Sequence, residues 1–389
     1  MRRAAIVDFV RTPFFKGRGG GTLVNFHPVD LYSLVLQGLI KRNEIDPRLI
    51  DDVITGCVLQ VGEQAGNIGR QAVLAAGLPE SVPAVTIDRK CGSAQQAFDF
   101  AAQGIIAGAY DVVIAGGVEM MSLIPMKMNR MGKDSEGKNF KLRYPEGMVH
   151  QGIAAERIAS KWQFSRNQLD EFALASHQKA VGDESKSQDI IGVPIDTEFV
   201  CEDEGIRKNS SLEALSALPP AFENAEWKKR FPEINWSVTA GNSSPVSDGA
   251  CAALVVEESI AMKMGLTPRC IISHFAVAGD DPMMLLTGII PATKKLLDKA
   301  GVKLSDIHAY EVNEAFASVP LAWQKELGAN PEFLNTFGGA IALGHPVGAS
   351  GGRLFGNIMR SMEQSKSKYG LITMCESGGM ANATLLERA

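Results

Sequence analysis

The chain has 389 residues, of which 45% are hydrophobic and 21% are charged, and its formal net charge at pH 7 is −5. This composition is typical of a folded globular protein and argues against a disordered chain, and the length allows two or three subdomains. The acidic balance gives no reason to expect nucleic acid as a partner. Every apolar run is interrupted by Gly or by a charged residue before it reaches the length of a membrane span.

Six cysteines are scattered along the chain without a C-x-x-C pair; they are Cys57, Cys91, Cys201, Cys251, Cys270 and Cys375. This spacing favours reduced thiols over a disulfide framework and offers no zinc or other metal site. The chain begins Met1-Arg-Arg and leads directly into an apolar strand, without the features of a signal peptide. These patterns predict a cytoplasmic protein.

The first half of the chain alternates apolar strands with helical periodicity. The pattern predicts strands over residues 4–10, 51–57, 82–87 and 111–117 and helices over 30–43 and 92–108. The strands are apolar throughout rather than at alternate positions, which indicates that both faces of each strand are covered. The predicted fold class is therefore α/β.

The second half of the chain repeats this order. The pattern predicts helices over residues 291–300 and 351–362 and strands over 306–312 and 370–375. The matched strands that begin at Asp51 and Asp306 are 255 positions apart, and the glycine-rich turn around His345 follows Cys91 at about the same spacing. The spacing predicts two copies of one unit, with active-site turns that face each other.

Residues 119–247 interrupt the repeat and contain predicted helices over 152–163 and 167–182. This segment is too long for a connection and too structured for a linker, so it indicates an inserted subdomain. A basic stretch near its start comprises Lys127, Arg130, Lys133, Lys138, Lys141 and Arg143. Two interpretations of this stretch are open: a solvated loop, which we favour, or attraction of a polyphosphate ligand.

Cys91 lies in Asp88-Arg-Lys-Cys91, where an apolar strand turns into a helix. Unpaired N–H groups at a helix N-terminus stabilise negative charge, so this position is expected to lower the pKa of the thiol and to bind a developing oxyanion. An arbitrary cysteine is more often a buried structural residue. The turn position, followed by Gly92 and Ser93, favours a nucleophile instead.

Two further turns carry groups suited to the same chemistry. His345 precedes Pro346, which restricts the backbone of the histidine and so fixes the direction of its ring. Cys375 ends an apolar strand in Thr-Met-Cys-Glu-Ser-Gly-Gly. Asn313 closes the strand over 306–312, where a turn-forming role is equally open. Two thiols and one imidazole at such turns indicate covalent thioester chemistry.

Five motifs resemble those of the thiolase family of acyl-CoA acyltransferases. In chain order they are the cysteine turn at 88–97, Val238-Thr-Ala-Gly-Asn-Ser-Ser244 with Asp248-Gly-Ala250, Asn313-Glu-Ala-Phe316, Gly344-His-Pro-Val-Gly-Ala-Ser-Gly351, and the cysteine turn at 374–379. The resemblance covers essentially the whole chain. It implies a five-layered α-β-α-β-α core of two similar halves, 1–118 with 248–265 and 266–389, with 119–247 as an inserted loop domain that binds coenzyme A.

The resemblance also implies roles for these residues. Cys91 matches the acyl-accepting nucleophile, His345 the residue that activates it, and Cys375 the acid/base that exchanges a proton with the acetyl carbon or with the thiol of coenzyme A. Asn313 matches the residue that anchors a catalytic water, which forms one oxyanion site with His345. The backbone N–H groups of Cys91 and Ser377 would form the other oxyanion site.

Contacts with coenzyme A are implied in the same way. Arg207 matches an arginine beside the adenine, Ser244 matches a serine near the pantetheine, and three residues match the lining of the thioester end: His150, Ala315 and Phe316. Coenzyme A would then be a substrate, with no metal or other cofactor. The expected partners are acyl-CoA and coenzyme A, without nucleic acid, and the expected assembly is a homodimer or a homotetramer.

Three positions depart from the family pattern. Asp88 stands where many members have Asn, and Gln151 stands where short-chain acetoacetyl-CoA enzymes often have Met. Ser377 stands where Gly is usual, and its backbone N–H remains a usable donor only if φ is negative there. Gln151 argues against a substrate limited to four carbons.

The resemblance implies a 3-ketoacyl-CoA thiolase, which uses coenzyme A to cleave its substrate into acetyl-CoA and a shortened acyl-CoA. Degradation of fatty acids or of sterol-like side chains is the expected setting. One alternative is biosynthesis of acetoacetyl-CoA from two acetyl-CoA. A more distant one is a non-catalytic acyl-CoA or lipid carrier, which the presence of Cys91, Asn313, His345 and Cys375 disfavours.

Overall fold

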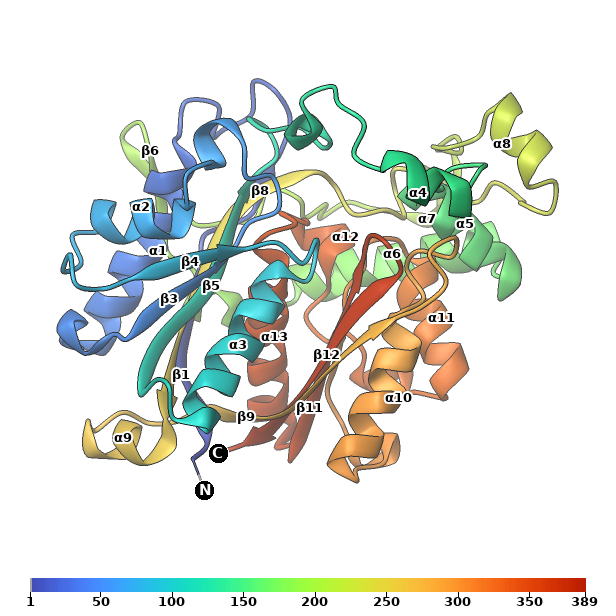
Figure 1. Cartoon of the computed structure of the whole chain (residues 1–389). Helices are drawn as coiled ribbons and strands as arrows, with labels where there is room; N and C mark the ends of the chain where they lie inside the picture. Colours follow the sequence, from blue (N-terminus) through green and yellow to red (C-terminus); the bar gives the residue numbers. More distant parts are fainter. Residues whose placement is uncertain (1) are drawn as a thin grey trace.

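The computed structural model describes residues 2–389 (Figure 1). The N-terminal half comprises β1 (Ala4–Arg11), β2 (Phe15–Lys16), α1 (Pro28–Asn43), β3 (Asp52–Gly56), α2 (Ile68–Ala75), β4 (Ala84–Ile87), α3 (Ser93–Ala107), β5 (Val112–Met120), β8 (Ser247–Glu257) and α9 (Glu258–Lys263). The C-terminal half comprises β9 (Cys270–Gly279), α10 (Ile289–Ala300), β10 (Tyr310–Val312), α11 (Ser318–Leu327), α12 (Ala340–Leu343), α13 (Ser350–Ser365), β11 (Tyr369–Glu376) and β12 (Met380–Arg388).

The two halves share one pattern of strand pairing. In the first half β3 pairs with β5 in parallel, β5 with β8 antiparallel and β8 with β1 antiparallel. In the second half β10 pairs with β11 in parallel, β11 with β12 antiparallel and β12 with β9 antiparallel. The outermost strand of the first half, β4, has no full equivalent among the described strands of the second half. A single parallel bridge between Tyr310 and Leu334 stands at the corresponding position. The predicted repeat is therefore confirmed.

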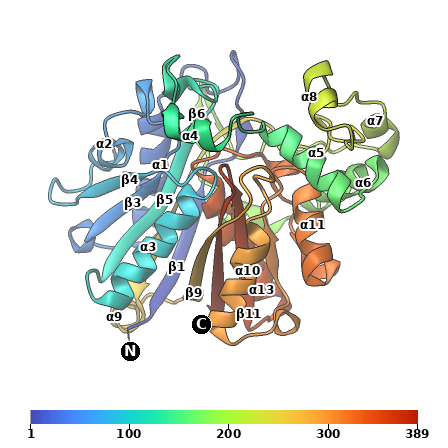
Figure 2. The same cartoon turned by 45° about the vertical axis from the view of Figure 1, so that its right-hand side comes forward.

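The two half-sheets are joined along one edge. β1 and β9 pair antiparallel over three residue pairs, Ala4 with Ile272, Ala5 with Ile271 and Ile6 with Cys270. The strands consequently follow a single path, β10-β11-β12-β9-β1-β8-β5-β3-β4. Beyond this short seam the half-sheets diverge and leave room for helices between them (Figure 2).

Two apolar helices fill the space between the half-sheets. α3 and α13 contact each other and strands of both halves, and the rings of Phe98 and Phe355 stack across them with centroids 4.1 Å apart. α1 and α2 cover the outer face of the first half, and α10 and α11 cover that of the second (Figures 1 and 2). The result is the predicted five-layered α-β-α-β-α core.

Most predicted elements lie where the patterns placed them, with two kinds of difference. The strand predicted over 306–312 is reduced to Tyr310–Val312, because Leu304–Asp306 forms a short 3-10 helix. β8, β9 and β12 were not among the predicted strands. All three are antiparallel strands that complete the half-sheets.

The insertion leaves the core after β5 and returns at β8. It contains α4 (Gly137–Arg143), α5 (Gln151–Lys161), α6 (Arg166–Val181), β6 (Val193–Ile195), β7 (Glu198–Val200), α7 (Leu212–Ser216) and α8 (Ala225–Arg230). α5 and α6 bury Ile153 and Leu169 in one hydrophobic core with Ile289 and Trp323 of the C-terminal half. A buried ion pair of Arg11 and Asp203, 2.6 Å apart, also ties the insertion to β1.

The basic stretch of the insertion is exposed throughout, which fits the solvated loop. Among residues 2–389, no helix is long and apolar enough to cross a bilayer.

Candidate active site

The turn that carries Cys91 is held by its own polar groups. Lys90 adopts a left-handed conformation with φ of 50°. Asp88 accepts a hydrogen bond from the backbone N–H of Lys90 at 2.7 Å, and Ser93 accepts one from that of Arg89 at 2.9 Å. These bonds place Cys91 immediately before α3, buried to 5% exposure. A non-glycine residue in this backbone region carries strain, which the surrounding bonds offset.

The glycine-rich turn of His345 packs directly on this first turn of α3. A Cβ at Gly351 would lie 2.3 Å from the backbone nitrogen of Gln95, so only glycine permits the approach. Val347 and Cys91 belong to the same buried cluster. The structure thus brings the two turns together, although 254 positions separate Cys91 from His345.

The hydrogen bonds of His345 define its tautomer. Ser350 donates its hydroxyl to the carbonyl of Pro346 at 2.9 Å, and it lies 2.7 Å from Nδ1 of His345. With the hydroxyl hydrogen on the Pro346 carbonyl, Nδ1 carries the ring proton and donates it to Ser350. Nε2 is then a free lone pair, and it has no partner in the described part of the chain. Burial, followed by the charge of Arg353, lowers the pKa of His345 to about 3, so the ring is neutral.

Ser350 was not among the predicted site residues, although it stands in the quoted motif five positions after His345. We expect Ser350→Ala to lower kcat about tenfold, because losing one neutral hydrogen bond of about 1 kcal/mol frees the tautomer and the ring. Steady-state kinetics would measure this change, with Ser259→Ala on α9 as a distant control. An unchanged kcat would show that Ser350 does not orient the histidine.

Cys375 and Asn313 are neighbours because β10 and β11 run in parallel. Val312 pairs with Thr373, and the backbone N–H of Asn313 donates to the carbonyl of Thr373 at 3.1 Å. Both side chains are buried, and the Asn313 amide reaches the Cys375 thiol closely enough to lower its pKa. Within residues 2–389 neither amide atom of Asn313 has a well-aligned hydrogen bond. Unpaired buried amide atoms are costly, so this amide is free to hold a water or substrate oxygen.

The expectation that the helix terminus lowers the pKa of Cys91 is wrong for this structure. Burial raises the pKa of Cys91, and the neighbouring Cys375 and Glu376 raise it further. Burial likewise raises the pKa of Cys375 to about 12, against the opposing contact of Asn313. The helix terminus cannot offset this desolvation. Both sulfurs are therefore stored as neutral thiols and need a base at the moment of reaction.

Ser377 fulfils the condition for a backbone donor. It begins the turn after β11, where Gly378 and Gly379 have φ of 96° and 78°, whereas Ser377 is absent from the residues with positive φ. Its N–H can therefore point as the N–H of a glycine with the same negative φ would. Its pairing with the N–H of Cys91 as an oxyanion site remains a prediction.

Four of the five proposed coenzyme A contacts form one continuous surface. Ser244 donates its hydroxyl to the carbonyl of Ala315 at 3.0 Å, and Phe316 follows directly. The ring of Phe222 lies 6.0 Å from Phe316 and 5.4 Å from His150. Phe222 was not predicted, and its position in the insertion carried no motif to reveal it.

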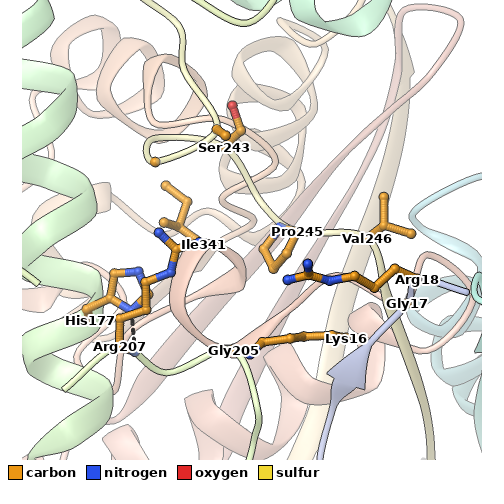
Figure 3. Close-up of a pocket in the computed structure, with 12 residues that line it drawn as sticks. Lys16, Gly17, Arg18, His177, Gly205, Arg207, Ser243, Pro245, Val246 and Ile341 are labelled. Atoms are coloured by element: carbon orange, nitrogen blue, oxygen red, sulfur yellow. Dashed lines mark hydrogen bonds between the residues drawn. The ribbon is translucent and has the colours of Figure 1, made fainter. Parts of the chain in front are cut away.

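Arg207 lies apart from that row, on a cavity of about 160 Å³ at the base of the insertion (Figure 3). Its backbone N–H donates to Nδ1 of the buried His177 at 3.2 Å. Lys16 and Arg18 line the same cavity, with the backbone around Ser243 on its opposite side. Among the described residues that line it, three are cationic and none is a carboxylate. The cavity is suited to an anionic group.

These features define a class of protein. Two similar α/β halves bring a buried thiol, a second thiol beside an amide, and a neutral imidazole to the same end of the molecule, a combination suited to acyl transfer through a cysteine.

Comparison with known proteins gives the family. A model of the thiolase N-terminal domain matches residues 4–259, and one of the thiolase C-terminal domain matches residues 266–388. The chain belongs to the thiolase family, which is a family of acyltransferases.

Individual relatives cover the whole chain. A steroid 3-ketoacyl-CoA thiolase of Mycobacterium tuberculosis is 43% identical over 100% of this chain and 95% of its own length. A 3-ketoacyl-CoA thiolase of Aliivibrio fischeri is 40% identical, and an acetyl-CoA acetyltransferase of Escherichia coli is 38% identical, each over 100% of both chains. The crystal structure of the Bacillus anthracis acetyl-CoA acetyltransferase superimposes with a TM-score of 0.87 at 34% identity, over 100% of this chain and 99% of the other.

Proposed function

We propose that the chain is a 3-ketoacyl-CoA thiolase that works through a thioester on Cys91. The observation that carries this proposal is the placement of two buried thiols, with Cys375 close enough to raise the pKa of Cys91, beside a turn whose His345 keeps a free Nε2. One thiol can hold the acyl group while the other moves protons.

The proposed reaction has two halves. In the first, Nε2 of His345 takes the proton of Cys91 as its sulfur attacks the 3-keto carbon. The bond between C2 and C3 then breaks, and the departing acetyl-CoA enolate takes a proton at carbon from Cys375. In the second, the Cys375 thiolate takes the proton of incoming coenzyme A, whose sulfur attacks the thioester. The released Cys91 sulfur recovers its proton from His345.

Each oxyanion in this scheme has donors at hand. The amide of Asn313, which has no well-aligned hydrogen bond within the described residues, can anchor a water that shares one oxyanion with His345. The N–H groups of Cys91 and Ser377 supply the other. A single such donor is typically worth about 3–4 kcal/mol of barrier. Because protein groups and coenzyme A account for every proton and bond, the proposal needs no metal or further cofactor.

Arg207 and the cavity beside it are proposed to attract the nucleotide end of coenzyme A. We expect Arg207→Ala to raise KM for coenzyme A about five- to tenfold with little change in kcat, because an exposed cation contributes binding of about 1 kcal/mol that is equal in ground and transition states. Thiolysis rates at varied coenzyme A concentration measure this. Arg48→Ala, at the far end of the N-terminal half, is the matched control. An equal loss in kcat would show that Arg207 contributes to the chemical step and not only to binding.

The degradative direction is proposed from two observations. Gln151 begins α5 at the insertion where short-chain enzymes often carry Met, and two of the relatives are named for 3-ketoacyl-CoA thiolysis, one of them for steroids. The acetyl-CoA acetyltransferase relatives keep acetoacetyl-CoA synthesis as the second candidate. Thiolysis of 3-ketoacyl-CoAs from four carbons upwards tests the choice. Higher kcat/KM on long or branched chains supports degradation, and activity confined to four carbons supports synthesis.

We further propose a homodimer or homotetramer. β4 is an edge strand with Val85 41% exposed, and α3 exposes Phe100 and Ile106 to 41% and 37%. Exposed apolar groups beside an open strand edge favour association. A cytoplasmic location is proposed because all six cysteines are free and the chemistry requires two reduced thiols.

A further inference from the structure

Behind the Cys91 turn lies a buried carboxyl group that the reaction does not use. Glu376 follows Cys375 in β11 and is 0% exposed. Neither of its oxygens accepts a hydrogen bond from any group in residues 2–389, and no lysine or arginine of those residues forms an ion pair with it. An ionised carboxylate in that setting carries a large desolvation cost, which a proton removes.

The carboxyl group touches the backbone of the nucleophile turn. A Cβ at Gly92 would lie 2.0 Å from Oε1 of Glu376 and 3.1 Å from Oδ1 of Asn382, so both side chains occupy the space where residue 92 has none. Gly92 directly follows Cys91 and caps α3. A shift of the Glu376 side chain would therefore move Gly92, and with it the sulfur of the adjacent Cys91.

Asn382 offers an acceptor for a proton on Glu376. Its amide nitrogen donates to Oε1 of Gln96 and to Oδ2 of Asp99, each at 3.2 Å. Burial raises the pKa of Asp99 to about 7, and above that pH its carboxylate can only accept. The amide is therefore fixed with Oδ1 turned away from Asp99, and this oxygen has no donor within the described chain. One proton on Glu376 gives both groups a partner.

The charged groups around Glu376 favour the same state. Asp88 precedes the nucleophile turn and Asp99 faces from α3; both oppose ionisation, while Arg89 favours it without forming a pair. The two thiols, Cys91 and Cys375, lie close enough for the charge of Glu376 to act on them. The dipole of α3 would favour a carboxylate. However, the N–H groups of Gly92 and Ser93 are already bonded to the carbonyls of Arg89 and Lys90.

We propose that Glu376 is a positioning residue that acts as an uncharged acid. Its proton bridges to Oδ1 of Asn382, which holds Gly92 and the Cys91 turn in place and keeps negative charge away from both thiols. Burial raises the pKa of Glu376 to about 8, so the group is neutral below that pH and charged above it. Its charged form raises the pKa values of both thiols, so the thiols become harder to activate as pH rises through that value.

The test compares wild type with Glu376→Gln, whose amide can donate to Asn382 and never ionises. The probe is iodoacetamide, with alkylation of the Cys91 peptide followed by mass spectrometry from pH 6 to pH 10. We expect the alkylation rates to agree at pH 6, where Glu376 is neutral, and that of Glu376→Gln to be about tenfold higher than that of wild type at pH 10. The exposed Glu332→Gln is the matched control and should follow wild type. Coincident profiles for wild type and Glu376→Gln would overturn the proposal.

A second measurement reads the protonation state itself. The infrared difference spectrum between wild type and Glu376→Gln at pH 7 should contain the C=O stretch of a neutral carboxylic acid, and a carboxylate band in its place would contradict the proposal. Misfolding of Glu376→Gln would do so as well, because it would show that the charged form is needed. The inference rests on the proposed function. Because alkylation of Cys91 does not require thiolysis, a failure of the proposed role of Glu376 can be distinguished from a failure of the proposed function.

Discussion

Replacing Cys91 with alanine is expected to abolish the acyl-enzyme and to lower kcat at least about 10⁴-fold, since the neighbouring thiol of Cys375 serves proton transfer and not attack on the substrate. The substitution removes a buried sulfur and leaves the bonds around the turn, made by Asp88 and Ser93, in place. The folded structure should survive with a loss of about 1 kcal/mol or less for the small cavity.

Intact-mass spectrometry after mixing with a 3-ketoacyl-CoA checks this expectation. Wild type should gain the mass of the shortened acyl group, and Cys91→Ala should gain nothing. Cys270→Ala is the matched control, because Cys270 is equally buried but lies on β9. Covalent labelling of Cys91→Ala at any other cysteine would show that the nucleophile has been assigned to the wrong sulfur.

Replacing Cys375 with serine is expected to lower turnover about 10³-fold while acylation of Cys91 remains detectable. A serine hydroxyl is a much weaker acid than a thiol, so it can neither protonate the enolate carbon nor take the proton of coenzyme A. Asn313 should still contact the smaller hydroxyl, so the local structure is kept.

Rapid mixing separates the two halves of the reaction in this variant. A slow burst of acyl-enzyme followed by almost no release is the expected pattern, and the exposed Cys201→Ser should behave as wild type. If Cys375→Ser acylates normally and releases product normally, the second thiol has no part in proton transfer.

The fold was predictable to the extent that its strands are continuous apolar runs. β3, β5 and β11 lie in parallel pairs, and their mostly apolar sequences separated them from the helices. β8, β9 and β12 were not predicted, although they lie in the interior of the strand path. β8 and β9 pair with strands far apart in the chain, which no local pattern encodes, whereas β12 forms a hairpin with β11 that the patterns did not reveal.

The candidate site was predictable where backbone demands leave a mark on the sequence. Glycine is required at 351 and 92 because of close contacts with Gln95 and Glu376. These glycines make the two turns recognisable in the sequence. The protonation states were not predictable in this way. Whether Cys91 is stored as a thiol or a thiolate depends on burial and on Glu376, which reach it only through the tertiary fold.

The most direct test of the whole account is a crystal structure of Cys375→Ser trapped with a 3-ketoacyl-CoA. The account predicts an acyl group on Sγ of Cys91, with Nε2 of His345 and the new hydroxyl at position 375 both within hydrogen-bond reach of the reacting carbons and oxygens. An acyl group on another residue, or a His345 ring turned away from the thioester, would contradict it.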